Sequence, residues 1–452
     1  MITVLVILIA LQSALWLRVI RPPRLSSAFA WGLMVQLFIP YGVVVAADSF
    51  MGIEVIRRGP HHFSLTNEEF QWVLVLANLL LAVMGTGYSA VSLLLPKRAS
   101  VPATALPQEV PRPRFAAKCL LIALLIYFAI WLVSVQGTVG IAELIRNPLI
   151  FRGNAEEGNL FGFLLPLTSL GIVTLSFPVL TICFEMRKHW PLSRSLFFAS
   201  LVFLVTGTVV WAQGGRGLLI AWLAIGFILA SPIRSRTTFF IAVCLSVTLF
   251  LLVTAFGHTL FSLDAWQAGI IGSIADELDN TLAFPEQRLQ KFVTFGQSII
   301  HPILVQDAME SGLAPHNFRD VPYLPLAFIP FGLHGIQYPH LQTEFMQLFP
   351  DPGANNNIKI LTYLLWGGGE AGVVFGGFFL GAFFRVCDYA INPPGLHPTT
   401  QGPSIFLAYT LGSGLMNGGP ISLRDCIPII IAVLLVRIIV SPKPVEVKRV
   451  IA

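Results

Sequence analysis

Charged residues are scarce in this chain of 452 residues. Asp, Glu, Lys and Arg together make up 11% of the sequence, whereas hydrophobic residues make up 55%. A soluble domain carries roughly a quarter charged residues, so the composition excludes an ordinary soluble enzyme or binding module. The mean hydropathy of +0.77 instead indicates a membrane protein.

Cysteine is also scarce, and internal repeats are absent. The five cysteines all lie in or at the ends of apolar runs, so we expect neither a disulfide nor a metal site: Cys119, Cys183, Cys244, Cys387 and Cys426. The net charge of +5 belongs to basic loops that face anionic headgroups. It carries no implication of binding to nucleic acid.

Long apolar runs are what the chain has instead. Runs able to cross about 30 Å of hydrocarbon predict about eleven spans in an all-α, polytopic membrane protein. They lie near residues 2–18, 27–47, 71–95, 119–136, 160–183, 196–212, 217–231, 238–257, 358–388, 403–419 and 426–440. We expect an N-terminal bundle (1–257), a long loop (258–357) and a C-terminal bundle (358–452).

The basic residues predict the orientation. The first span has no basic residue before it and Arg18, Arg21 and Arg24 after it, the reverse of a signal peptide. We therefore interpret it as a retained anchor with its N-terminus outside. Most of the 28 lysines and arginines then lie inside together with the C-terminus, as the positive-inside rule requires.

A few arginines fall on the outer side, against this bias, and indicate an anionic ligand there. Arg216 lies in the glycine-rich turn 213–217, where the backbone can approach a ligand closely just before a helix begins. Arg146 and Arg152 share one outer loop, and Arg424 lies in another. The alternatives are a snorkelling side chain for Arg216, and ion pairs with neighbouring acidic residues for the other three.

The long loop is too apolar to be a linker. Spacing of three to four predicts an amphipathic helix within 261–282 and a second from about 287 to 300, ended by Pro302. A proline-rich stretch follows, which carries polar candidates: His316, Arg319, Asp320, His334 and His340. We interpret the loop as a cover over a membrane-embedded cavity, although any single histidine there is more often structural than catalytic.

Glu370 follows three glycines in the outer half of the ninth predicted span. An ionisable residue at membrane depth is a functional candidate by default. Its alternative role is to pair with one of the outer arginines.

The chemistry that suits these residues is the transfer of a group from a lipid pyrophosphate. Guanidinium groups bind phosphate oxygens bidentately and stabilise the charge that grows on a departing pyrophosphate. An acceptor hydroxyl also needs a general base, and the candidates are His316, Asp320, His340 and Glu370. The one dense acidic group (Asp276, Glu277 and Asp279) lies on the polar face of a predicted helix, which favours a metal-independent mechanism.

The layout resembles the Wzy-type polymerases of bacterial surface polysaccharide, particularly those of enterobacterial common antigen. The elements that match are the loop with Arg146 and Arg152, the turn Gly214-Gly215-Arg216, the stretch from Gly312 through Arg319-Asp320 to Pro330, the glycine-rich ninth span and the loop with Arg424. The order of these elements covers most of the chain.

The resemblance implies a glycosyltransferase of the C-type membrane fold in the bacterial inner membrane. Such an enzyme transfers a growing glycan from undecaprenyl pyrophosphate to a lipid-linked repeat unit at the periplasmic face, without a cofactor. A Wzz-like chain-length regulator is then an expected partner, and Arg152, Arg216 and Arg319 would hold the pyrophosphates. An O-antigen ligase is the nearest alternative, and a flippase or transporter of lipid-linked sugars is more distant.

Overall fold

The computed structural model describes a large part of the chain. This part comprises residues 1–19, 26–38, 41, 66–96, 113–146, 160–186, 190–212, 216–230, 241, 244–245, 248, 269, 272–276, 279, 297–328, 341–349, 359–392, 398–418 and 423–440. Arg152, His334 and His340 lie outside the described residues, as do most of the predicted span 238–257 and most of the predicted helix 261–282.

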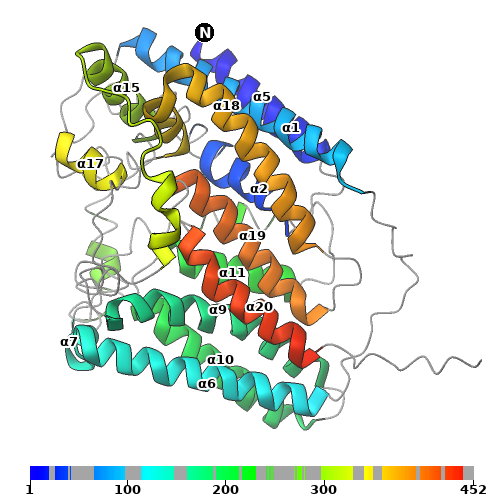
Figure 1. The fold of residues 1–452 in the computed structure, drawn as a ribbon. Coiled ribbons are helices and arrows are strands. Elements are labelled where there is room, and N and C mark those ends of the chain that lie inside the picture. Colours follow the sequence, from blue (N-terminus) through cyan, green and yellow to red (C-terminus); the bar gives the residue numbers. More distant parts are fainter. Residues whose placement is uncertain are drawn as a thin grey trace, which may run out of the picture.

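The described segments are helical, with no strand among them. In chain order they are α1 (Ile2–Val19), α2 (Ala28–Gly32), the π-helix η1 (Leu33–Phe38), α5 (Asn67–Leu94), α6 (Pro113–Thr138), α7 (Ile141–Arg146), α9 (Leu160–Met186), α10 (Leu192–Ala212), α11 (Arg216–Ala230), α15 (Gln297–Glu310), the 3₁₀ helix η4 (Val321–Phe328), α17 (Leu341–Leu348), α18 (Ile360–Ile391), α19 (Pro398–Gly418) and α20 (Cys426–Val440) (Figure 1).

Five of the described helices are long and apolar enough to cross a membrane, namely α5, α6, α9, α10 and α18. They coincide with the predicted spans near 71–95, 119–136, 160–183, 196–212 and 358–388, and the chain is an all-α membrane protein. Four further predicted spans are helices that are shorter or less apolar: α1, α11, α19 and α20. The predicted span 27–47 begins as α2 and η1, and most of its remaining residues lie outside the described part of the chain.

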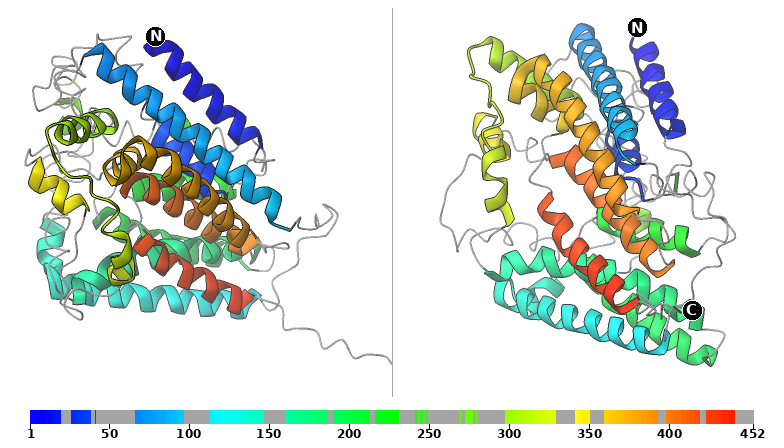
Figure 2. Two further views of the ribbon diagram at one scale, coloured as in Figure 1. Left: turned by 45° about the horizontal axis from the view of Figure 1, so that its top comes forward. Right: turned by 45° about the vertical axis from the view of Figure 1, so that its right-hand side comes forward.

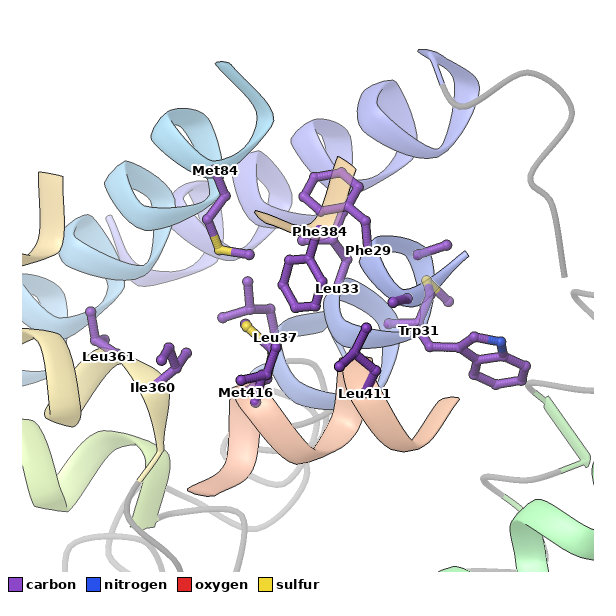
Figure 3. Packing of buried hydrophobic residues seen from close by; sticks show 14 of the residues in the cluster. Phe29, Trp31, Leu33, Leu37, Met84, Ile360, Leu361, Phe384, Leu411 and Met416 are labelled. Carbon is purple, nitrogen blue, oxygen red and sulfur yellow. The ribbon is translucent and has the colours of Figure 1, made fainter. Parts of the chain in front are cut away.

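Two hydrophobic clusters hold the described helices together. The first joins α1, α2, α5, α15, α18 and α19, and Figure 3 shows Phe29, Met84, Phe384 and Met416 converging within it. The second joins α6, α9, α10 and α20. Helices from 1–257 and from 358–452 therefore contribute to both clusters.

The contact between α5 and α18 depends on a close approach of the two backbones. A Cβ atom on Gly381 would lie only 1.9 Å from the carbonyl oxygen of Met84, so any other residue there would push the helices apart. Small residues at such crossings are typical of membrane helices, because packing rather than the hydrophobic effect holds these helices together.

Asp388, near the end of α18, caps the start of α2. Its carboxylate accepts hydrogen bonds from the Ser27 hydroxyl (2.6 Å), the Ala28 backbone N–H (2.6 Å) and the Tyr88 hydroxyl (3.0 Å). The side chain is buried. A buried carboxylate with three donors satisfies polar groups that a helix start would otherwise leave without a partner.

The prediction that Pro302 ends a helix is wrong. The helix α15 runs from Gln297 through Pro302 to Glu310. A proline inside a helix costs about 3 kcal/mol. Burial of Ile300, Ile303 and Val305 in the first cluster offsets this cost, because each buried aliphatic side chain contributes about 1.5–3 kcal/mol.

Three short helices, α7, α15 and α17, gather at one end of the molecule. In Figure 1, α7, α15 and α17 all lie toward the left, and both views of Figure 2 keep them on that side. The helix α18 packs against α15, and the predicted site residues of 316–320 belong to the segment that directly follows α15.

Candidate functional site

A break in α18 organises the candidate site. Gly368 (φ −160°, ψ 25°) and Gly369 (φ 60°, ψ −152°) depart from helical geometry, and the conformation of Gly369 lies in the left-handed half of the map that glycine alone adopts easily. Just before the break, the carbonyl oxygen of Trp366 accepts a hydrogen bond from the backbone N–H of His316 (2.8 Å). The segment that follows α15 is thereby attached to the break.

The side chain of Phe318 also attaches this segment to α18. Its ring packs so closely on α18 that a Cβ atom on Gly367 would lie 2.2 Å from it, and it lies 5.6 Å from the Tyr363 ring. Asn317 (φ 54°) and Phe318 (φ 53°) both adopt the left-handed conformation, which is rare for residues other than glycine. Such strain persists only where the surroundings enforce it, and it clusters at functional sites.

His316 is the buried centre of the site and lies between two carboxylates. Its Nδ1 lies 3.7 Å from Oδ1 of Asp320, and its Nε2 lies 3.5 Å from Oε2 of Glu344. Both distances exceed a hydrogen bond, and neither ring nitrogen has a hydrogen-bond partner among the described residues. The ring is fully buried and packs near Trp366. Burial lowers the pKa of His316 below its ordinary value, although both carboxylates oppose the shift.

Asp320 is held in place from α18. The Tyr363 hydroxyl donates a hydrogen bond to its carboxylate, at 3.0 Å from one oxygen and 3.3 Å from the other. The side chain of Asp320 is nearly buried. The polar groups therefore follow one another in a line, which runs from Tyr363 through Asp320 and His316 to Glu344.

Arg319 is the exposed cation of the site. Its Nε donates to the backbone carbonyl of His316 (3.1 Å), and its Nη2 lies 3.4 Å from Oε2 of Glu344. The side chain is 57% exposed, so its other N–H groups remain available to a ligand. A guanidinium that stays charged and a group able to take a proton thus lie next to each other.

The structure brings together three of the residues predicted from the sequence, His316, Arg319 and Asp320. It adds Glu344, Tyr363 and Trp366, which were not among the predicted residues. Trp366 adjoins the glycine run of the predicted ninth span, but nothing in the local sequence of α17 marks Glu344. Its role depends on contact between segments that are distant in the chain.

The remaining predicted residues lie apart from this cluster or outside the described side chains. Arg216 is the first residue of α11 and Arg146 the last of α7, and the side chains of both lie outside the described part. Arg424 faces Asp425 at 3.8 Å, with both side chains partly exposed, which is the ion pair considered as its alternative role.

Glu370 follows the break in α18 directly, and its side chain is exposed. It makes no ion pair with a described residue. A carboxylate in the first turn of a restarting helix complements the helix dipole, which is a structural role.

Among the described residues, no three His, Cys, Asp or Glu side chains are grouped closely enough to hold a metal ion. No family model, curated protein or solved structure matches this chain.

Proposed function

We propose that this protein is a membrane glycosyltransferase that polymerises lipid-linked oligosaccharide repeat units. It transfers the growing glycan from undecaprenyl pyrophosphate to the next lipid-linked unit, without a metal ion. The observation that carries the proposal is the exposed guanidinium of Arg319 beside the buried, carboxylate-flanked His316. The guanidinium suits a pyrophosphate, and the cluster around His316 supplies groups that can take a proton from a hydroxyl.

The topology belongs to the same proposal. The chain crosses the bacterial inner membrane about eleven times, with its N-terminus outside and its C-terminus inside. The site then faces the periplasm. In support, three helices too short to cross a membrane, α7, α15 and α17, gather at one end of the bundle, and Glu344 of the candidate site belongs to α17.

The reaction needs two events at one anomeric carbon. The acceptor oxygen loses its proton to a base and forms a bond to that carbon, while the bond to pyrophosphate breaks and its electron pair leaves with the pyrophosphate. Arg319 stabilises the leaving group, because preorganised cations are strongest where charge develops in the transition state. Arg152, Arg216, Arg146 and Arg424 are further candidates for binding the two pyrophosphates, and a Wzz-like regulator is the proposed partner.

The experiment that tests the proposal is the incubation of purified protein, reconstituted into vesicles, with an undecaprenyl-pyrophosphate oligosaccharide and lipid A core in EDTA. A product ladder spaced by one repeat unit is expected. Transfer to lipid A core without a ladder would instead identify an O-antigen ligase. Unchanged substrate that moves across vesicle membranes would identify a flippase, and either result would refute the polymerase.

A further inference from the structure

The base that activates the acceptor must reach the substrate, and exposure separates the three groups of the cluster that can take a proton. The side chain of His316 is 0% exposed and that of Asp320 is 11% exposed, whereas that of Glu344 is 26% exposed. A general base acts within hydrogen-bond reach of the proton that it removes. Glu344 alone of the three offers its carboxylate to a ligand.

The location of Glu344 also suits this task. Its Oε2 lies 3.4 Å from Nη2 of Arg319 and 3.5 Å from Nε2 of His316. The carboxylate therefore adjoins both the proposed pyrophosphate-binding cation and a buried imidazole. The base and the cation that stabilises the leaving group act on the same carbon, so both must lie within reach of it, and Glu344 and Arg319 lie close enough to share one substrate.

We propose that Glu344 is the general base that removes the proton from the acceptor hydroxyl, and that His316 and Asp320 are the positioning residues behind it. The inference rests on the proposed function. The proton moves from the hydroxyl to the carboxylate of Glu344 as the new bond to the anomeric carbon forms. The electron pair of the broken bond leaves with undecaprenyl pyrophosphate, so atoms and charge balance without a further reactant.

The buried groups have a consistent role in this arrangement. His316 faces Glu344, which belongs to α17, and it also faces Asp320 and Arg319, which belong to its own segment. Tyr363 of α18 in turn orients Asp320 through a hydrogen bond. Because neither ring nitrogen of His316 has a hydrogen-bond partner among the described residues, the imidazole is free to hydrogen-bond Glu344 when that carboxylate becomes protonated. A second proton position behind the base allows the proton to leave Glu344 before the next turnover.

The competing explanation is that Glu344 only forms an ordinary ion pair with Arg319. Partly exposed pairs of this kind contribute little to stability, roughly 0–1 kcal/mol. A structural role therefore predicts small effects on both activity and folding, whereas general-base catalysis predicts a large effect on kcat alone.

The test compares variants of the full-length protein in the polymerisation assay, with undecaprenyl-pyrophosphate oligosaccharide as donor and acceptor. Glu344→Gln is expected to lower kcat by about 10²–10⁴-fold with little change in KM. Glu310→Gln, which alters an exposed carboxylate on α15, is the matched control and should retain the wild-type rate. A wild-type protein without polymerase activity would refute the proposed function, whereas an active wild type with an equally active Glu344→Gln would refute only the role of Glu344.

A second measurement separates catalysis from structure. Glu344→Ala opens space beside Arg319, and added formate should restore part of the rate, because a small carboxylate can replace a base that faces the substrate. Rescue by formate in Glu344→Ala, without rescue in Asp320→Ala, is expected. Rescue confined to Asp320→Ala would instead make Asp320 the base. For His316→Gln we expect a shifted acid limb of the pH–rate profile, and an unchanged profile would remove His316 from its positioning role.

Discussion

Nε2 of His316 lies 3.5 Å from Oε2 of Glu344, although one residue follows α15 and the other belongs to α17. This contact joins two segments of the long loop over the first turns of α18. The backbone bond from His316 to Trp366 fixes the first segment at the glycine break. The candidate site is therefore a product of three segments, and each can be disturbed separately.

Arg319 is expected to act on the rate rather than on the fold. Arg319→Gln should lower kcat by about 10²–10³-fold, as the loss of a preorganised charge in a transition state does. Arg319→Lys should recover part of this loss, because it keeps the charge but not the planar fork. Polymerisation rates and thermal unfolding of both variants, with the exposed Arg114→Gln as control, measure this effect. Full activity of Arg319→Gln would remove Arg319 from the site.

Gly367 is expected to be essential because it has no side chain to occupy the space that the Phe318 ring fills. Gly367→Ala places a Cβ atom 2.2 Å from the Phe318 ring and should cost about 1–3 kcal/mol of stability through overpacking. Gly226→Ala in α11 is the control, because a Cβ atom there meets nothing within 4 Å. Chemical unfolding in detergent measures both. Phe318→Ala should cost less in the Gly367→Ala background than alone, and strictly additive losses would contradict the contact.

The titration of His316 is expected to make stability depend on pH. Burial lowers its pKa in the folded state below the ordinary 6.5, so the unfolded state binds more protons as the pH falls below about 6.5. The contribution of His316 is therefore complete above about pH 6.5 and is lost as the pH falls toward the lowered pKa. Unfolding of wild type and His316→Gln between about pH 5 and about pH 7, a window that contains the ordinary value, measures the difference. Equal slopes for both proteins would contradict a depressed pKa.

Asp388 is expected to affect folding without affecting the chemistry. Asp388→Ala leaves three donors without their acceptor and should cost about 1–3 kcal/mol for each group that stays buried. Asp388→Asn keeps one acceptor oxygen and should cost less. The rate per folded molecule should match wild type in both variants, because Asp388 lies at the other end of α18 from Tyr363. A specific loss of kcat would show that the two ends are coupled.

The sequence predicts the helical membrane fold well, because continuous apolar runs determine α5, α6, α9, α10 and α18. It also identifies His316, Arg319 and Asp320, which are close in the chain and meet by local turns. Glu344 and Tyr363 could not be found in this way, since only tertiary packing brings them to His316. The path of α15 through Pro302 was mispredicted, because the local cost of a proline is evident in a sequence and the burial that offsets it is not.

The central claim, glycan transfer with release of a lipid pyrophosphate, is tested most directly by single-turnover kinetics. Purified protein in EDTA is mixed with a labelled, single-repeat undecaprenyl-pyrophosphate oligosaccharide, and dimer and free undecaprenyl pyrophosphate are counted together. We expect one undecaprenyl pyrophosphate for every dimer, with both slowed in parallel by Arg319→Gln. Release of undecaprenyl pyrophosphate without a dimer, or no release by a folded protein, would contradict the account.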